Sequence, residues 1–405
     1  MDRPGAPCPA WMVTRFEAHG GAMPFCQFMD LALHDPDHGA YGSGALQVGV
    51  GGDFVTSPSL GGDFAALLAQ QVREWLDQLH AADPEVPLSL VEVGPGEGQL
   101  AFDLINALVQ LAPSWLHRLS LVMVERNEGM QSRQRERLSG CTAVPIRWMS
   151  LEDLHAQPVT GVLVGHELLD AFAVERLVLR KGEPRQMSVV LTQSPQGEPW
   201  LEWSDQPLPG ALQQQLLWAR DVCNVPIPPP QAEEGWTTEW HSGIGPWMES
   251  AAKALKAGVL LVVDYAHEAS RYYNPRRPAG TLMAYRQQIA SADLLAFAGE
   301  ADLTAHLCLE TLIAWAQQAG FGVVGQCRQG EALLALGLGE RLHALQQLPG
   351  TQLGEALTRR EALLRLVDPA ALGDFRWVAF GRNANSRFDL QTLRSRCFES
   401  PGFPH

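Results

Sequence analysis

The segment that most constrains the fold is Leu88–Val93, a nearly unbroken apolar run that stops at Gly94-Pro95-Gly96. A run of this kind is typical of a strand buried on both faces of a parallel sheet, because helices then cover both sides. The apolar residues that follow recur at helical spacing and predict a crossover helix: Leu100, Leu104, Leu108 and Leu111. The segment therefore predicts one strand–turn–helix unit of an α/β sheet.

The same alternation continues along the chain. An amphipathic helix is expected over residues 64–79, before the first strand, and further strands are expected at 119–125, 146–149, 161–165 and 258–264. A helix over 303–320 and strands over 321–324 and 375–380 are expected to close the far edge of the sheet. This order predicts an open, doubly wound α/β sheet.

An excursion separates the strand at 161–165 from the strand at 258–264, and it is far longer than an ordinary loop. Half of the 12 tryptophans fall in it: Trp200, Trp203, Trp218, Trp236, Trp240 and Trp247. We expect residues 62–180 and 258–385 to form the core, residues 1–61 an N-terminal lid segment, and residues 181–257 an inserted cap. Alternatively, the tryptophans form the hydrophobic core of a small subdomain.

Charge and composition exclude several classes of protein. The formal net charge of −15 disfavours a surface that binds nucleic acid. No apolar stretch reaches the ~18 residues of a membrane span, and no secretory or transit segment is evident at the N-terminus. The seven cysteines include no C-x-x-C pair, so no zinc site or disulfide framework is expected. We expect a cytoplasmic protein with reduced thiols.

The glycines after the first strand lie where open α/β sheets bind ligands, in the order Glu92-Val-Gly94-Pro95-Gly96-Glu-Gly98. Glycine lets the backbone approach a ligand closely. A dinucleotide-binding loop has the spacing G-x-G-x-x-G, whereas this loop has G-x-G-x-G. It resembles the first motif of class I S-adenosylmethionine methyltransferases. The alternative is a turn with a purely structural role.

Two more acidic positions follow the next strands. Glu125 ends the second strand, and its carboxylate can accept hydrogen bonds from both hydroxyls of a ribose. Leu151 and Asp153 follow the third strand, where methyltransferases commonly hold the adenine, and Asp153 is the candidate for its amino group. On sequence alone, Asp153 is equally well explained as a helix N-cap.

Several blocks together resemble one family, the MidA-like methyltransferases, which are related to the mitochondrial complex I assembly-factor arginine methyltransferase. The blocks are Phe28–Pro36, Gly52–Pro58, Glu92–Gly98, His166–Ala171, Tyr272–Pro275 with Gly280–Met283, and Gly299–His306. The resemblance implies a class I methyltransferase fold, S-adenosyl-L-methionine as cofactor, and a protein substrate that presents an arginine. It also implies that no catalytic metal is needed.

The chain departs from the family pattern at a few positions around the expected site. It has Ala40-Tyr41-Gly42 for Gly-Tyr-Tyr, Ser59 for Glu, Glu97 where Arg is common, and His166 for Asn. None of these changes removes a loop glycine, but substrate choice or activity could differ from that of relatives.

A guanidinium acceptor requires carboxylates that grip it and fix one nitrogen on the methyl axis. Glu167 and Asp170 stand three apart after the fourth strand, where a helical turn would place both on one side. Glu167 is the first candidate to hold the guanidinium and Asp170 the second. His166 is a candidate cofactor contact or proton acceptor. Alternatively, Asp170 caps a helix, Glu167 pairs with a structural arginine, and His166 is an ordinary hydrogen-bonding residue.

Two other segments are assigned to the site because of the resemblance. Tyr265, Asp302, Thr304 and His306 are candidates to shape the acceptor pocket, although Asp302 or Thr304 could instead cap the helix expected there. Asp53, Thr56 and Ser57 belong to a loop that is expected to cover the cofactor, with an ordinary turn as the alternative.

The expected function is transfer of a methyl group from S-adenosyl-L-methionine to a protein arginine. One rival is a non-catalytic assembly or binding protein that keeps the fold. A dinucleotide-dependent oxidoreductase is disfavoured by the glycine spacing. The sequence leaves the protein substrate, the number of methyl groups and the oligomeric state open, with a homodimer as one option.

Overall fold

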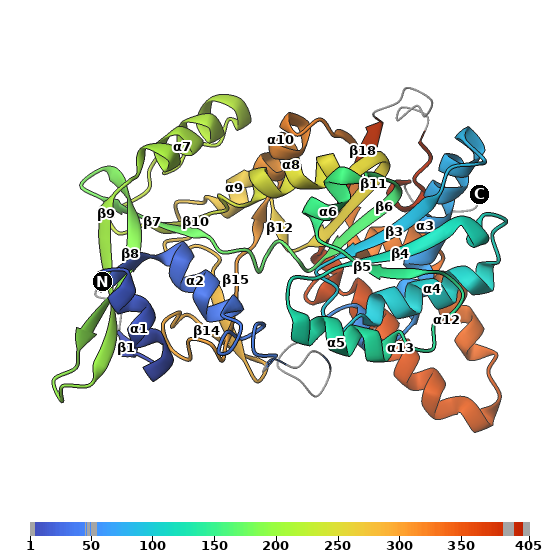
Figure 1. Cartoon of the computed structure of the whole chain (residues 1–405), viewed down its shortest axis with the longest axis horizontal. Coiled ribbons are helices and arrows are strands. Elements are labelled where there is room, and N and C mark those ends of the chain that lie inside the picture. Colours follow the sequence, from blue (N-terminus) through green and yellow to red (C-terminus); the bar gives the residue numbers. More distant parts are fainter. Residues whose placement is uncertain (1–4, 45, 47–48, 50–54, 384–392, 400–405) are drawn as a thin grey trace.

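The computed structural model describes residues 5–44, 46, 49, 55–383 and 393–399. Its central element is a seven-stranded sheet in the order β17-β18-β11-β6-β3-β4-β5 (Figure 1). The strands are β3 (Leu88–Val93), β4 (Leu119–Val124), β5 (Ile146–Trp148), β6 (Val159–His166), β11 (Leu255–Asp264), β17 (Gly322–Arg328) and β18 (Arg376–Asn383). The first five are parallel, and β17 and β18 close one edge antiparallel. The predicted doubly wound sheet and its far edge are therefore confirmed.

Helices cover both faces of this sheet. One face packs against α3 (Asp63–Ala82), α4 (Gln99–Leu111), α11 (Gln329–Ala335), α12 (Leu338–Gln346) and α13 (Leu353–Val367). The other face packs against α6 (Leu151–Ala156), α8 (Ile244–Ala254) and α10 (Leu309–Gln318). Buried strand side chains on both faces explain why Leu88–Val93 reads as an unbroken apolar run. The remaining helix of the alternation, α5 (Glu128–Arg137), follows β4.

The helix predicted over 303–320 begins only at Leu309. The residues before it form two short strands instead. β15 (Asp302–Thr304) pairs with β13 (Met283–Arg286), which also pairs with β14 (Ile289–Ser291), and β16 (Leu307–Cys308) pairs with β12 (Ala266–His267). Pairing with segments distant in sequence overrides the local helical spacing. The N-cap of α10 is Cys308, so neither Asp302 nor Thr304 caps it.

A second sheet of six antiparallel strands lies at the opposite end of the molecule (Figure 1). It joins the N-terminal strands β1 (Ala6–Pro7) and β2 (Ala22–Pro24) to β7 (Glu175–Arg180), β8 (Glu183–Gln193), β9 (Pro199–Pro207) and β10 (Thr237–Trp240). The helices α1 (Ala10–Ala18) and α2 (Phe25–His34) pack on it, and α7 (Gly210–Cys223) follows β9. The predicted lid segment and insertion therefore share one sheet. In the structure β7, which was expected in the core, joins this second sheet, and α8, which was expected in the insertion, packs on the core sheet.

Two of the six tryptophans of the predicted cap are buried in the protein, and the other four are half-buried. Trp236 and Trp240 are 3% and 2% exposed in the core beneath α7. Trp218 stacks on Trp315 with ring centroids 3.9 Å apart. Among the tryptophans of the insertion, Trp247 lines the large cleft described below. The alternative of a small hydrophobic core thus accounts for Trp236 and Trp240.

In the described part of the chain, no helix has both the length and the apolar character that crossing a bilayer requires.

Candidate active site

A cleft of about 1580 Å³ opens at the carboxyl ends of β3, β4 and β6. The loops that follow these strands line it, together with residues after β5 and parts of the N-terminal segment. Open α/β sheets bind ligands at this edge, where strand ends and helix starts converge. Nine of the predicted site residues line the cleft: Thr56, Glu92, Gly94, Pro95, Gly96, Glu125, Leu151, His166 and Glu167.

The glycine loop adopts a backbone that side chains disfavour. Gly94, Gly96 and Gly98 all have positive φ, at 65°, 52° and 81°. A Cβ on Gly94 would lie 2.5 Å from Cδ1 of Leu168, whereas a Cβ on Gly96 would point into open space. Gly98 is the N-cap of α4 and does not line the cleft. The loop is therefore shaped to bring bare backbone to the cleft at Gly96.

Glu92 is a buried carboxylate with an open hydrogen-bonding position. Its side chain is 5% exposed, and its Oε2 has no hydrogen-bond partner. Burial raises the pKa of Glu92 to about 8. A buried carboxylate oxygen facing a cleft without a partner is well suited to the ammonium of an amino-acid group, and S-adenosylmethionine carries one.

Glu125 lies directly after β4 and is held in place by two groups. Its Oε1 accepts a hydrogen bond from the backbone N–H of Asn127 at 2.8 Å, and Nε2 of Gln134 lies 3.4 Å from its Oε2. Burial raises the pKa of Glu125. The carboxylate lines the cleft with acceptor capacity left for a diol, as a ribose requires.

Gln134 is a positioning residue that sequence reasoning missed. Its fully buried amide donates to the carbonyl of Gly96 at 2.7 Å and accepts from Nε1 of Trp148 at 2.9 Å. It therefore fixes the glycine loop and Glu125 relative to each other. The sequence signal that could have identified Gln134 was a glutamine on the inner face of a helix otherwise rich in Arg and Glu.

Asp153 is not brought to the cleft. Ser150 is the N-cap of α6, and its side chain and that of Asp153 form a reciprocal capping box with hydrogen bonds of 2.9 and 3.0 Å. Leu151 and Glu152 line the cleft instead. The structure thus corrects the adenine assignment of Asp153. It also differs from the N-cap alternative, because Ser150 is the N-cap and Asp153, at the third helical position, completes the capping box.

Glu167 has an unusual backbone. Its φ is 48°, in the left-handed region, so the predicted helical turn is wrong at this position. Its N–H donates to the carbonyl of Val263 at 2.8 Å, and its Oε1 accepts from the backbone N–H of Ser57 at 3.2 Å. The strained turn points the carboxylate toward the cleft.

His166 lies beside this carboxylate, with Nδ1 3.6 Å from Oε1 of Glu167. Burial lowers the pKa of His166 to about 3, so the ring is neutral at pH 7. Its Nε2 is buried without a hydrogen-bond partner. The ring packs edge-on against Phe64 at 5.2 Å. His166 lines the cleft as a neutral residue that can still accept or donate one hydrogen bond.

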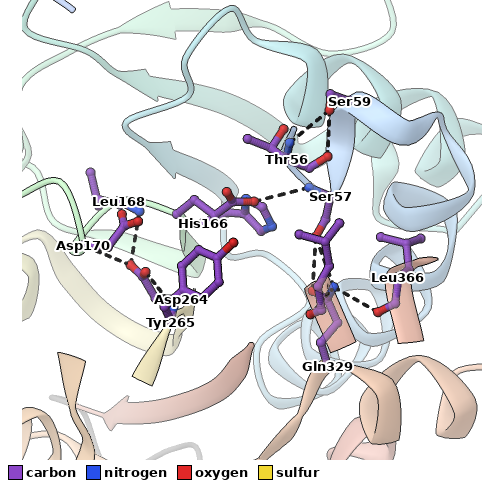
Figure 2. Close-up of polar contacts among 12 residues, drawn as sticks. Thr56, Ser57, Ser59, His166, Leu168, Asp170, Asp264, Tyr265, Gln329 and Leu366 are labelled. Carbon is purple, nitrogen blue, oxygen red and sulfur yellow. Dashed lines mark hydrogen bonds and ion pairs between the residues drawn. The ribbon is translucent and has the colours of Figure 1, made fainter. Parts of the chain in front are cut away.

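Asp264 organises the turn that carries Glu167, and sequence reasoning missed it although it ends a predicted strand. Its Oδ1 accepts from the backbone N–H of Tyr265 at 2.8 Å. Its Oδ2 faces three backbone N–H groups, at 3.3, 2.8 and 3.3 Å, from Leu168, Leu169 and Asp170. Figure 2 shows Asp264 under this turn beside Tyr265. The turn is thus built around a buried carboxylate.

Four carboxylates gather here, and we call Glu167, Asp170, Asp264 and Asp302 the acidic cluster. Burial and then the charge of Asp170 raise the pKa of Glu167 well above its usual value, with further contributions from Asp264 and Asp302. Burial raises the pKa of Asp170 to about 7. The ion pairs described in the structure link none of Glu167, Asp170 and Asp264 to a Lys or Arg. The cluster is therefore suited to a cationic group supplied from outside.

Two tyrosines border the acidic cluster. Tyr41 lines the cleft and hydrogen-bonds to Asp302, and burial together with the charges of Asp302 and Asp170 raises its pKa well above 10. Burial, followed by the charges of Glu167 and Asp170, also raises the pKa of Tyr265. Tyr265 contacts the cluster but does not line the cleft. Tyr41 was quoted only as part of a departure from the family pattern, and its role in the site was missed.

Thr304 and His306 are held by partners of their own near the acidic cluster. Thr304 pairs with Met283 in β15. The His306 ring stacks on His267 at 4.5 Å, and burial lowers its pKa to about 3. The backbone N–H of Ala305, between them, donates to the carbonyl of Asp170 at 3.0 Å. Neither Thr304 nor His306 is among the described residues that line the cleft.

The loop expected to cover the cofactor is described in part. Asp53 lies outside the described residues. Thr56 and Ser59 line the cleft, and Ser59 closes the turn by accepting from the N–H of Thr56 at 3.0 Å and donating to its carbonyl at 2.8 Å (Figure 2). Ser57 is fully buried and turned away from the cleft.

The other departures from the family pattern have local partners. Glu97 pairs with Arg137 at 3.1 Å. Gly42 has no room for a side chain, because a Cβ would lie 1.9 Å from the carbonyl oxygen of Asp35. The carbonyl of Gly42 accepts from Nδ2 of Asn127 at 2.6 Å, which ties the N-terminal segment to the residues that hold Glu125.

The residues around the glycine loop fit the adenosyl cofactor. The cofactor carries an ammonium, which suits the unpartnered oxygen of Glu92, and a ribose, whose hydroxyls suit the acceptor oxygens of Glu125. The bare backbone at Gly96 lets the cofactor approach the loop closely.

Comparison with known proteins gives the same assignment. Residues 67–327 match a family described as "Putative S-adenosyl-L-methionine-dependent methyltransferase". A crystal structure of a candidate methyl transferase from Burkholderia thailandensis, bound to S-adenosyl-homocysteine, is 27% identical with a TM-score of 0.77, covering 95% of this chain and 94% of that chain.

Two curated relatives are both named "Protein arginine methyltransferase NDUFAF7, mitochondrial". The protein from Danio rerio is 27% identical over 80% of this chain and 75% of its own length. The protein from Homo sapiens is 24% identical over 94% of this chain and 85% of its own length. Together with the family match and the geometry of the cleft, these similarities show that the chain belongs to this family of S-adenosyl-L-methionine-dependent methyltransferases.

Proposed function

We propose that the protein methylates an arginine side chain of a protein substrate. The observation that carries the proposal is the acidic cluster, which adjoins the cofactor cleft at Glu167 and has no Lys or Arg partner for Glu167, Asp170 or Asp264 among the described ion pairs. A planar guanidinium with several donors fits a set of carboxylates better than a neutral hydroxyl acceptor does. The names of the curated relatives support the same acceptor.

The charges that line the cleft favour a cationic partner. Seven carboxylates line its described part: Asp30, Glu92, Glu97, Glu125, Glu128, Glu152 and Glu167. Two arginines, Arg126 and Arg137, face them, and each is within ion-pair distance of one of these carboxylates. A cleft lined by charges of one sign concentrates ligands of the other sign. A positively charged cofactor and an arginine-bearing segment are both favoured.

We call the part of the cleft lined by the glycine loop, Glu125 and Leu151 the cofactor half. There we propose that Glu92 binds the ammonium of the cofactor and that the backbone of Gly94–Glu97 approaches it closely. Glu125 then binds the ribose, and Leu151 contacts the edge of the adenine. S-adenosyl-L-methionine supplies a methyl group on a positively charged sulfur. The protein's own part is to place the acceptor nitrogen in line with that methyl group and to exclude water.

In the acceptor half, we propose that Glu167 and Asp170 orient the guanidinium through charge-assisted hydrogen bonds. As the nitrogen–carbon bond forms and the sulfur–carbon bond breaks, the guanidinium loses one proton. Burial raises the pKa of Glu167, so this carboxylate is suited to receive that proton. His166, neutral beside Glu167, and Tyr41 complete the wall of the site.

The test compares the arginine methylation of proteins in cells that carry the native gene, the Glu167→Gln gene or no gene. Mass spectrometry should find one or a few methylarginine sites that disappear in both altered strains. Loss of methyl groups from lysine, from a small molecule or from no residue at all would refute the arginine assignment. Unchanged cofactor binding with no lost methylation would favour the rival, a non-catalytic assembly protein.

We also propose the cytoplasm as the location. All seven cysteines are free thiols in the structure, as a reducing compartment permits. Fractionation of the host cell with detection of the native protein measures the location. For the oligomeric state the homodimer is the simplest proposal, and light scattering of the purified protein measures it.

A further inference from the structure

Ser57 lies between the acceptor carboxylate and the C-terminal helices. Its side chain is fully buried, and its backbone N–H donates to Oε1 of Glu167 at 3.2 Å. Figure 2 shows Ser57 with its backbone on the side of His166 and its side chain directed toward Gln329. Ser57 thus contacts Glu167 through its main chain and a distant segment through its hydroxyl.

Gln329, the first residue of α11, is a fully buried amide with several partners. Its Nε2 donates to the carbonyls of Leu366 and Leu372 at 3.2 and 3.0 Å. The Ser57 hydroxyl lies 3.1 Å from this Nε2 and 3.4 Å from Oε1, and Nε1 of Trp377 donates to Oε1 at 3.3 Å. Its backbone N–H also bonds to the carbonyl of Phe375 at 2.8 Å.

The hydrogen-bond capacity of this amide sets the role of Ser57. An amide nitrogen has two hydrogens, and the carbonyls of Leu366 and Leu372 accept them. The amide oxygen therefore accepts from the Ser57 hydroxyl and from Trp377. The described hydrogen bonds of the buried Ser57 hydroxyl all go to Gln329, so loss of this amide would leave the hydroxyl unsatisfied, and a buried polar atom without a partner is costly.

The segment that Gln329 holds also carries the turn closed by Ser59. Thr56, Ser57 and Ser59 form one short loop whose only described contact with the acceptor carboxylate is the Ser57 N–H. Glu167 itself has a left-handed backbone, which surrounding contacts must maintain. Fixing the loop therefore fixes the oxygen of Glu167 that the loop contacts.

We propose that Gln329 is a positioning residue that holds the loop of residues 55–60 against Glu167 and so sets the orientation of the acceptor carboxylate. The role assigned to Glu167 rests on the proposed function. Gln329 touches neither the cleft nor the cofactor loop. Its effect is on the acceptor step and leaves cofactor binding unchanged.

The first arm of the test measures the loop itself and needs no substrate. Amide hydrogen exchange of residues 55–60 is compared by mass spectrometry in the full-length native protein, Gln329→Ala and Ser57→Ala. Faster exchange of this segment is expected in both variants. The matched control is Gln71→Ala, a fully buried glutamine whose described hydrogen bonds go to Glu74 and Cys397 and not to the loop. Unchanged exchange in Gln329→Ala would overturn the proposal.

The second arm measures the reaction on the methylarginine site that the cell comparison identifies. Ser57→Ala and Gln329→Ala should each lower kcat on the order of tenfold, while calorimetry finds an unaltered affinity for S-adenosylhomocysteine. The double variant should be no slower than Gln329→Ala, because both changes remove one link. Gln71→Ala should keep the native kcat. Weakened cofactor affinity in parallel with kcat, or independent effects in the double variant, would refute a positioning role.

The two arms separate the failure of each idea. If the native protein methylates no arginine but Gln329→Ala loosens the loop, the proposed function fails and the link to Glu167 stands. If the native protein methylates arginine but hydrogen exchange of the loop is unchanged in Gln329→Ala, the proposed function stands and the positioning role of Gln329 fails. Ser57→Ala keeps the Gln329 bonds to Leu366 and Leu372, so it reports on the link even if Gln329→Ala folds poorly.

Discussion

The cofactor half of the cleft and the acidic cluster beside it come from very different stretches of chain. The cofactor half uses residues 92–97 at the end of β3, residue 125 directly after β4, and residues 150–152 shortly after β5, and these three parallel strands are neighbours in the sheet. The acidic cluster joins Glu167 and Asp170 to Asp264 and Asp302, which are about 100 and 130 residues further along. The cofactor half is therefore encoded by local motifs, whereas the acceptor half exists only when the chain has folded.

The two halves also differ in how their carboxylates are supported. For Glu92 and Glu125, the main cause of the raised pKa is the burial of the carboxylate itself. The carboxylates of the acidic cluster act on one another, since the charges of Asp170, Asp264 and Asp302 all raise the pKa of Glu167. Variants on the two sides should therefore affect different measured quantities, and the following predictions test that separation.

The largest effect is expected from Glu167→Gln. Because the neutral amide cannot grip a guanidinium or take its proton, kcat/KM should fall by at least about 10³-fold. The affinity for S-adenosylhomocysteine should stay within about threefold, because the cofactor half is intact. Calorimetry and methylation kinetics measure the two quantities. Glu183→Gln, at an exposed position, is the control, and a matching loss of cofactor affinity in Glu167→Gln would break the separation.

Gly96→Val should act on the opposite half. The new side chain would enter the open space in which the cofactor is expected to contact the backbone of the loop. The φ of 52° at residue 96 is also unfavourable for valine. We expect S-adenosylhomocysteine affinity to fall at least about 100-fold by calorimetry. Gly140→Val, at an exposed glycine with nothing within 4 Å, should bind normally. Native-like cofactor affinity in Gly96→Val would show that the loop does not approach the ligand.

A pH titration should sharpen the comparison. Burial raises the pKa of Asp170 from 3.8 to about 7 in the folded protein, so its neutral form is favoured there. Its contribution to stability is fully present below pH 3.8 and is lost as pH rises through about 7.

The Tm of the ligand-free protein should accordingly fall by a few °C over this window, and Asp170→Asn should flatten the profile. Asp37→Asn, an exposed carboxylate, should leave the profile unchanged. A native profile that is already flat would contradict the burial of an ionisable cluster. In the same window kcat/KM should rise with pH, because a guanidinium requires ionised carboxylates.

The smallest effect is expected from Asp153→Ala. Loss of the capping box should cost about 1 kcal/mol of stability, since one helix N-terminus loses its reciprocal bonds. Cofactor affinity should change by less than about twofold, because the carboxylate is used in the cap. Thermal unfolding and calorimetry measure both. A tenfold loss of affinity would restore Asp153 as an adenine contact.

Sequence patterns located residues that line the cleft after β3, β4 and β5, since a strand, a glycine turn and the next strand ends are local features. Prediction from local spacing was wrong at the start of the helix expected at 303–320, because residues 302–304 pair with a strand about 20 residues earlier. The helical turn expected at Glu167 fails for a related reason. Asp264 gathers three backbone N–H groups from that turn, and no spacing within the turn predicts a partner 94 to 96 residues away.

By itself, the sequence determined where the core strands lie along the chain, the glycine loop with Glu92 and Glu125, and the pair Glu167 and Asp170, since each depends on residues close together in the chain. Only the tertiary structure decided that Asp264, Asp302 and Tyr41 join that pair, that Asp153 caps a helix, and that Ser57 and Gln329 lie behind Glu167. Burial and the capacity of each polar atom for hydrogen bonds made these choices, because both are fixed only when distant segments pack together.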